Sequence, residues 1–159
     1  NDFVIKKSKN LSQNIAHFGF SLLILSILFN NIFSTEVITN LKIGETFNSE
    51  KIKISFESVN KKDGKNYKAI IGKFNIENEN GNIDIFNPEL RIYNQPNIAT
   101  SEADIKTNLF LDRFITMNLV QNQNYFNIRY QTKPLMIWIW ISVILISFGG
   151  IISLIKKQL

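Results

Sequence analysis

The chain has 159 residues, a net charge of +5 and no cysteine, so it offers no disulfide and no thiol for catalysis or metal binding. The basic excess is confined to the ends, where residues 1–14 and 156–159 hold five lysines and one acidic residue. The residues between them hold 13 basic and 12 acidic side chains. This nearly neutral middle does not indicate a nucleic-acid-binding surface.

Residues 15–33 form the first of two long apolar runs and contain no Lys, Arg, Asp or Glu. At about 1.5 Å per residue, a helix of this length crosses a hydrocarbon core of about 30 Å. Lys6, Lys7 and Lys9 precede the run, and lysine-rich flanks stay on the cytoplasmic side. We therefore expect a cytoplasmic flank at residues 1–14 and a transmembrane helix at 15–33. A cleaved signal peptide is the alternative, but no small-x-small cleavage site follows the run.

The middle of the chain, from residue 34 to residue 133, shows the pattern of an all-β domain. Ile52, Ile54 and Phe56 alternate strictly with polar residues, which is typical of a strand with one buried face. Asp63-Gly64 and Asn80-Gly81 are favoured turn sequences. Alternation and turns together predict seven to nine short strands, in a sandwich or a small barrel. Apolar residues mark the expected strands at 37–43, 52–57, 67–77, 83–85, 90–93, 109–120 and 125–130.

Two polar stretches of this domain, residues 89–91 and 101–106, contain weaker candidates for a site. Ser101 is a suitable N-cap, so one helical turn at residues 101–106 is an alternative to a strand. Glu102 and Asp104 could act as a carboxylate pair, although a solvated face explains them as well. Glu89 and Arg91 are expected to form a structural ion pair. The sequence contains no Gly-rich phosphate loop and no Ser/His/Asp set, and we expect no catalytic residue in this chain.

The second apolar run, residues 135–155, again lacks charged residues, and Lys156 and Lys157 follow it. It predicts a transmembrane helix over 134–155 and a cytoplasmic tail at 156–159, which leaves residues 34–133 outside. Trp138 and Trp140 occupy a position typical of interfacial anchors, and stacking on a porphyrin is the alternative. Small residues in the two runs would let the helices approach closely: these are Gly19, Ser21, Ser26, Gly149 and Gly150.

His17 is the only histidine, and it lies within the first apolar run. An ionisable residue inside a membrane helix is costly and therefore suggests a functional site. Neutral imidazole is a common axial ligand of haem iron. The alternative is that His17 packs near the inner interface and hydrogen-bonds a headgroup or a neighbouring helix. A haem with two histidine ligands would need its second histidine from a helix outside this chain.

Several stretches, taken in order, resemble one family. They are IAHFGF at residues 15–20, NPELRIY at 87–93, TSEADI at 100–105, KPLMIWIW at 133–140, and then Gly149 and Gly150. Nearly the whole chain is similar in this way to the C-terminal part of the CcmF family, the large membrane subunits of the cytochrome c haem lyase of System I.

The resemblance implies a function for the full protein. The CcmF family joins haem to the CxxCH motif of apocytochrome c, receives haem from the holo-chaperone CcmE and works with CcmH-type subunits. It also holds a haem b in the membrane, and His17 matches one axial ligand of that iron. The second ligand would come from other helices of CcmF.

The resemblance also limits what this segment does alone. The Trp-rich segment that handles incoming haem, with its flanking histidines, lies earlier in the family's sequence, so independent lyase activity is not expected. The location would be the bacterial plasma membrane or the mitochondrial inner membrane, with the β domain in the periplasm or intermembrane space. The alternative function is a non-catalytic, membrane-anchored β domain for partner docking or assembly.

Overall fold

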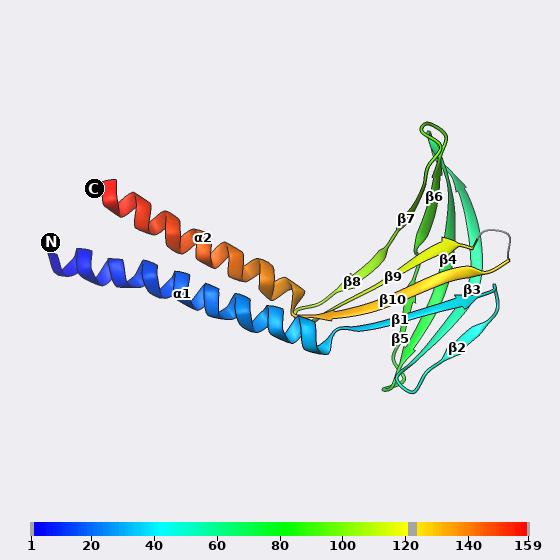
Figure 1. The fold of residues 1–159 in the computed structure, drawn as a ribbon, viewed down its shortest axis with the longest axis horizontal. Helices are drawn as coiled ribbons and strands as arrows, with labels where there is room; N and C mark the ends of the chain where they lie inside the picture. The colour runs from blue at the N-terminus through cyan, green and yellow to red at the C-terminus, as the bar shows by residue number, and fades with distance from the viewer. Residues whose placement is uncertain (1, 121–123, 159) are drawn as a thin grey trace. The chain divides into compact units, whose positions relative to one another are not determined.

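The computed structural model describes residues 2–120 and 124–158, with side chains described for residues 11–120 and 124–155. These residues form two units (Figure 1). The helical unit holds residues 2–34, 107–112 and 133–158, and the sandwich unit holds residues 35–106 and 113–132.

The sandwich unit contains two antiparallel sheets. One has the strand order β1-β10-β9-β8 and the other the order β2-β3-β4-β6-β7, with β5 also paired to β4. The expected all-β domain is therefore confirmed, as a sandwich and not a closed barrel. The strands are β1 Thr35–Leu41, β2 Thr46–Asn48, β3 Ile52–Asp63, β4 Tyr67–Asn78, β5 Ile83–Phe86, β6 Glu89–Tyr93, β7 Ala99–Glu102, β8 Asp104–Thr107, β9 Leu111–Leu119 and β10 Phe126–Pro134.

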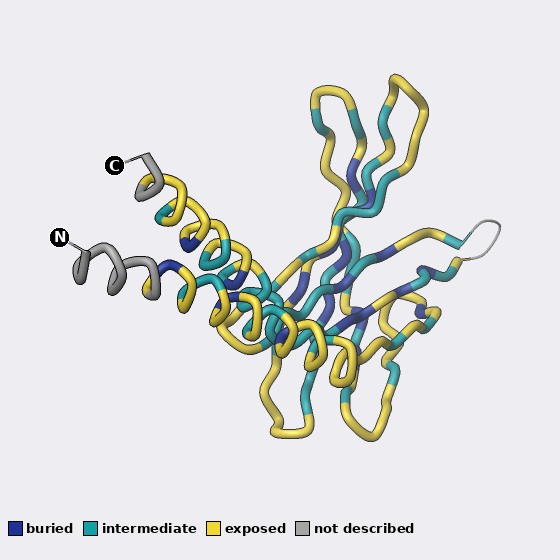
Figure 2. The backbone as a smooth tube through the Cα atoms, turned by 60° about the vertical axis from the view of Figure 1, so that its left-hand side comes forward, coloured by how far each residue is buried: buried dark blue, intermediate teal, exposed yellow. Residues whose placement is uncertain are grey.

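The core of the sandwich is built from alternate residues of the long strands. On β3 and β4 the antiparallel register pairs Ile54 with Ile76 and Phe56 with Phe74, and all four are almost completely buried. The rings of Phe56 and Phe74 stack with their centroids 4.3 Å apart. Buried residues follow the strands of the sandwich, whereas the helices are mostly exposed (Figure 2). The opposite sheet contributes Ile115, Met117, Ile128 and Tyr130.

The alternative of a helical turn at residues 101–106 is wrong, because this stretch is extended. β7 and β8 belong to different sheets, so the chain changes sheet at Ala103. The Ser101 hydroxyl donates to the carbonyl of Met117 at 2.9 Å and does not cap a helix. Pairing of β7 with β6 supplies backbone partners that an isolated helical turn would lack.

The strand expected at residues 83–85 is present as β5, but its apolar isoleucines are not on the side that faces the core. Ile83 and Ile85 were expected to continue the apolar pattern, but on β5 they face outward and are 61% and 46% exposed. Asp84 and Phe86 point inward instead, and Phe86 is fully buried. Only one set of alternate residues can face the core, and in β5 that set includes the large phenylalanine.

The helical unit is an antiparallel pair of helices, α1 (Asp2–Phe33) and α2 (Met136–Gln158). Within α1, the segment Leu11–Phe33 has a mean hydropathy of 1.7, and within α2, Met136–Ile155 has 2.3. Both segments are long and apolar enough to cross a membrane. The two helices lie side by side (Figure 1).

Small residues form the contact between the helices. Ser12, Gly19 and Ser26 of α1 are buried at intervals of seven residues, as are Ser142 and Gly149 of α2. A Cβ atom added to Gly149 would lie 2.9 Å from the backbone nitrogen of Ala16, so the backbones approach closely at this point. The small-residue prediction is therefore confirmed for Gly19, Ser26 and Gly149, whereas Ser21 and Gly150 are exposed.

Candidate functional site

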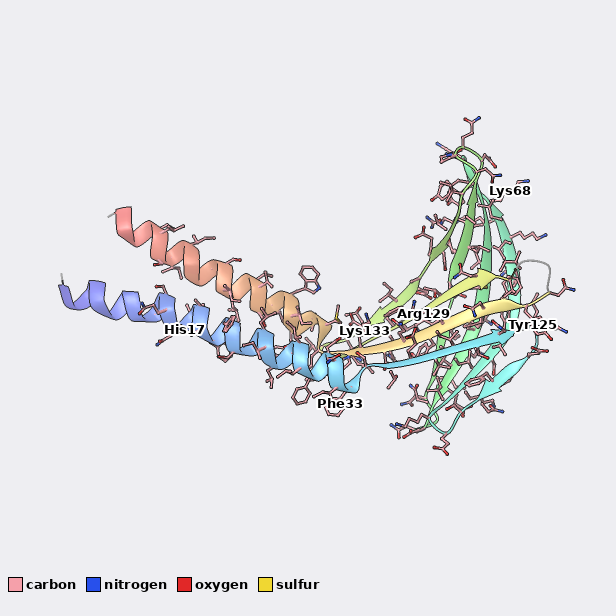
Figure 3. All side chains as sticks on the ribbon, viewed as in Figure 1. His17, Phe33, Lys68, Tyr125, Arg129 and Lys133 are labelled. Atoms are coloured by element: carbon pink, nitrogen blue, oxygen red, sulfur yellow. The ribbon has the colours of Figure 1, made fainter. Side chains whose placement is uncertain are left out.

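His17 lies on the face of α1 that points away from α2. It comes five residues after Ser12 and two before Gly19, both of which are buried against α2. At about 100° per residue, these spacings place His17 roughly 140–160° around the helix from the contact. The side chain is accordingly exposed (Figure 3).

From His17 toward the C-terminal end of α1, the same helix face is apolar and is not covered by α2. Phe20, Ile24 and Leu28 follow on the same face of α1 and are 56%, 45% and 51% exposed. A flat apolar group could therefore approach His17 without meeting α2. If a haem were bound, the His17 imidazole would be a suitable single ligand for its iron, and a second ligand would have to come from outside this chain.

The carboxylates singled out in the sequence already have partners. The backbone nitrogen of Asn87 donates to Asp104 Oδ2 at 2.6 Å, and the Thr100 hydroxyl donates to Glu102 Oε1 at 3.4 Å. Among the described residues, no group of three or more His, Cys, Asp or Glu could hold a metal ion. These contacts favour a structural role over an acid–base pair for both carboxylates.

The ion pair expected from the sequence is confirmed. Arg91 Nε donates to Glu89 Oε2 at 2.8 Å, and the guanidinium lies 5.0 Å from the centre of the Tyr67 ring. The hydrogen bond from Arg91 to Glu89 raises the pKa of the guanidinium, and a further hydrogen bond to Tyr93 adds to this effect. The pair lies at one wall of an open groove of about 430 Å³, lined by Asn87, Glu89, Arg91, Glu102, Ala103 and Asp104.

A second group of charged residues was not foreseen from the sequence. Asp84 of β5 binds Arg113 of β9 through Oδ2, while Oδ1 lies 3.4 Å from Lys106 Nζ of β8. Burial raises the pKa of the nearby Tyr130 phenol. Because three strands supply the charged partners, no local motif could have revealed this cluster.

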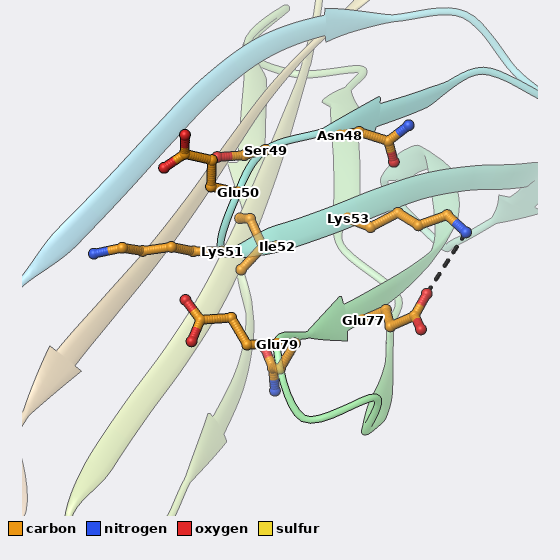
Figure 4. A pocket seen from close by; sticks show the side chains of 9 residues that line it. Asn48, Ser49, Glu50, Lys51, Ile52, Lys53, Glu77 and Glu79 are labelled. Carbon is orange, nitrogen blue, oxygen red and sulfur yellow. Dashed lines mark ion pairs between the residues drawn. The ribbon is translucent and has the colours of Figure 1, made fainter.

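A second open pocket, of about 290 Å³, lies beside the turn between β2 and β3 (Figure 4). Its charged residues have both signs, and Lys53 Nζ lies 3.6 Å from Glu77 Oε2. Exposed pairs of this kind contribute little stability and provide no nucleophile. We therefore assign no chemistry to this pocket.

The two tryptophans of α2 differ. Trp138 Nε1 donates to the carbonyl of Leu109 at 2.7 Å, whereas Trp140 is 65% exposed. The sequence did not reveal one contact near the helix ends. The side-chain amide of Asn30, in the last turn of α1, donates to the carbonyl of Pro134, two residues before α2 begins, at 2.8 Å. The only feature of the sequence that could have indicated this contact is that Asn30 is a polar residue near the end of the apolar run 15–33.

Fold and surface together define a membrane-associated class of protein, in which a β-sandwich is inserted between two antiparallel apolar helices. The family model described as the CcmF C-terminal beta-sandwich matches residues 32–134. This match covers more than half of the chain, so the chain belongs to that family. The resemblance drawn from the motifs is thereby confirmed.

The similar proteins are named as cytochrome c-type biogenesis proteins. The cytochrome c-type biogenesis protein CycK of Bradyrhizobium diazoefficiens is 23% identical to this chain in an alignment that covers 91% of the chain. CcmF of Escherichia coli is 22% identical over 90% of the chain. The chain spans 22% of the length of each of these relatives. A solved structure of the cytochrome c haem lyase CcmF matches 94% of the chain with a TM-score of 0.67 and 21% identity, which shows the shared fold.

Proposed function

We propose that this chain is the C-terminal segment of a CcmF-type subunit of the cytochrome c haem lyase. In this role it supports covalent attachment of haem to the CxxCH motif of apocytochrome c and is not active alone. The observation that carries the proposal is the family match over residues 32–134, with helices that extend the similarity to over 90% of the chain.

The role proposed for His17 is axial ligation of a membrane haem b. The exposed imidazole on the face of α1 opposite α2 supports this assignment. Haem b, when bound, would supply one-electron redox chemistry. The part of this chain is to hold the iron through an imidazole nitrogen and to present an apolar helix face to the porphyrin, while the second ligand comes from other helices of CcmF.

The topology proposed is that of an inner-membrane protein. Residues 15–33 and 134–155 span the membrane, the lysine-bearing flanks 1–14 and 156–159 are cytoplasmic, and residues 34–133 lie on the periplasmic or intermembrane-space side. The distribution of lysines supports this orientation. The proposed partners are the CcmE holo-chaperone, CcmH-type subunits and apocytochrome c.

The test is the haem b spectrum of the full protein carrying His17→Ala. We expect the reduced-minus-oxidised signal to be lost while the protein remains in the membrane. His17→Gly with added imidazole should restore part of the signal, because free imidazole can occupy the vacated ligand position. Gln13→Ala is the matched control, since Gln13 is polar, exposed and one turn away on the same face.

An unchanged haem signal in His17→Ala would contradict the ligand assignment. The histidine would then be a packing residue, and the chain a non-catalytic anchored domain for docking or assembly. The satisfied carboxylates of Glu102 and Asp104 agree with a non-catalytic sandwich, which this second function requires. Loss of cytochrome c maturation on removal of the sandwich, with haem b retained, would support it.

A further inference from the structure

The loop between β8 and β9, residues 107–112, belongs to the helical unit although both flanking strands lie mostly in the sandwich. Two backbone carbonyls fix it to the start of α2. The carbonyl of Leu109 accepts from Trp138 Nε1 at 2.7 Å, and that of Phe110 accepts from the backbone nitrogen of Leu135 at 2.9 Å. The loop therefore has a defined position on α2.

The loop is also held internally by one side chain. Asn108 Oδ1 accepts hydrogen bonds from the backbone nitrogens of Phe110 and Leu111, at 2.9 and 2.8 Å. These bonds satisfy backbone donors within the loop and leave its apolar side chains to project outward. The side chains of Leu109 and Phe110 are 57% and 66% exposed.

Other exposed apolar residues lie at the same end of the helix pair. Ile32 and Phe33, in the last turn of α1, are 67% and 57% exposed, and Trp140 near the start of α2 is 65% exposed. The hydrogen bond from Asn30 to Pro134 shows that these two helix ends meet. Leu109 and Phe110 therefore add two exposed apolar side chains at the end of the helix pair where α2 begins.

We propose that Leu109 and Phe110 insert into the interface of the lipid bilayer and that this loop is a third membrane contact of the chain. The inference rests on the proposed spanning of the two helices and goes beyond it. Residues 107–111 carry no charge, and Lys106 and Asp112 bound them. Tryptophan favours the headgroup level of a bilayer, and phenylalanine and leucine side chains insert at the boundary between headgroups and acyl chains. A loop with satisfied backbone groups can be accommodated there.

Site-directed fluorescence quenching tests the proposal in the full protein, reconstituted in phosphatidylcholine nanodiscs. Because this segment contains no native cysteine, Phe110→Cys or Leu109→Cys can carry an environment-sensitive fluorophore. Since the loop is held through backbone groups, we expect both variants to fold. One quencher is a nitroxide near the ester carbonyl of the lipid acyl chains, and the other is aqueous iodide.

Two further positions make the outcome unambiguous. Ile83→Cys is the matched control, because Ile83 is an apolar residue of the sandwich with 61% exposure. Ile144→Cys reports α2, where Ile144 is 66% exposed. We expect the lipid nitroxide to quench the Phe110 and Leu109 labels severalfold more strongly than the Ile83 label, and iodide to show the reverse order.

Two results would overturn the proposal. Labels at Phe110 and Leu109 that iodide quenches as well as it quenches Ile83 would place the loop in water. Labels protected from both quenchers would mean that protein from outside this segment covers the loop. If the Ile144 label is quenched by lipid in either case, the loop assignment fails while the membrane assignment of α2 stands.

Discussion

Tyr130 is a buried phenol whose ionisation is coupled to folding. It packs edge-on against Phe86, with ring centroids 6.1 Å apart, and burial raises its pKa above the ordinary value of 10.0. The Tyr130 phenol therefore begins to ionise at a lower pH in the unfolded chain than in the folded one. The stability contributed by the buried neutral phenol is complete below about pH 10 and falls as the pH rises further.

The first prediction follows from this coupling. In a fragment comprising residues 35–132, we expect the Tyr130→Phe variant to lose less stability between pH 9 and pH 11 than the unsubstituted fragment loses. Urea unfolding at several pH values measures the difference. Equal pH dependence of the two proteins would contradict the coupling. Tyr125→Phe is a suitable control because Tyr125 is only partly buried.

The second prediction concerns the stacked phenylalanines of the core. Phe74 is fully buried and stacks on Phe56, so Phe74→Ala removes an aromatic ring and leaves a cavity. We expect the free energy of unfolding of the fragment to fall by about 3–5 kcal/mol. Ile83→Ala, at an exposed position of β5, should change it by less than about 0.5 kcal/mol. Similar losses in both variants, measured by urea unfolding, would argue against this core.

Single residues of the candidate site could be foreseen only where the signal was local. His17 stood out because it is ionisable within an apolar run, and the Glu89–Arg91 pair because its members are two residues apart on one strand. The cluster of Asp84, Lys106 and Arg113 could not be foreseen, since it forms where β5 of one sheet meets β8 and β9 of the other.

At the scale of elements, glycine decides how closely the two helices pack. The position of Gly149 leaves no room for a Cβ, which would lie 2.9 Å from Ala16 and from the carbonyl of Ser12. Gly150, the next residue, has no heavy atom within 4 Å of the same added Cβ. The two adjacent glycines therefore form a matched pair for substitution.

The third prediction uses this pair. We expect Gly149→Leu to destabilise the helix pair by about 1–3 kcal/mol through overpacking, whereas Gly150→Leu should be nearly neutral. The thermal midpoint of the full protein in detergent gives the comparison. In the membrane, a disulfide between cysteines at positions 12 and 149 reports the helix contact directly in the otherwise cysteine-free segment. Equal midpoints for the two leucine variants would be evidence against the close approach.

Element types were predictable because periodicity and turn residues act locally. Long uncharged runs gave the helices, and strict alternation with Asp-Gly and Asn-Gly gave the β3–β4 and β4–β5 hairpins. Gly81 adopts a positive φ of 74° in the latter turn. A helical turn stayed an alternative for residues 101–106 because the sheet pairing that extends them is not visible in the local sequence.

At the scale of the whole molecule, the sandwich has its own hydrophobic core, and its first and last strands pair with each other. The first strand begins and the last strand ends at one point, where Thr35 Oγ1 and Thr132 Oγ1 lie 2.6 Å apart. The hydrophobic cluster lies within residues 41–130, with Val37 packed against it. These features predict that the sandwich is stable without the helices.

The fourth prediction is that a fragment of residues 35–132 folds cooperatively. We expect a single urea transition that coincides by circular dichroism and by tyrosine fluorescence, as small single domains usually show. Leu41→Ala, which removes a buried side chain of β1, should lower the midpoint in both probes together. Transitions that separate between the probes would indicate that the helices are required for folding.

The adjacency of the two helix ends has a mechanical consequence. β1 leaves α1, β10 enters α2 through Leu135, and the two strands pair over seven rungs from Thr35 with Thr132 to Leu41 with Phe126. Lipid offers helices no hydrophobic drive to stay together. The β1–β10 ladder therefore keeps the residue that follows α1 beside the residues that precede α2, so that separating the helices at this end requires breaking strand pairs, beginning with Thr35 and Thr132.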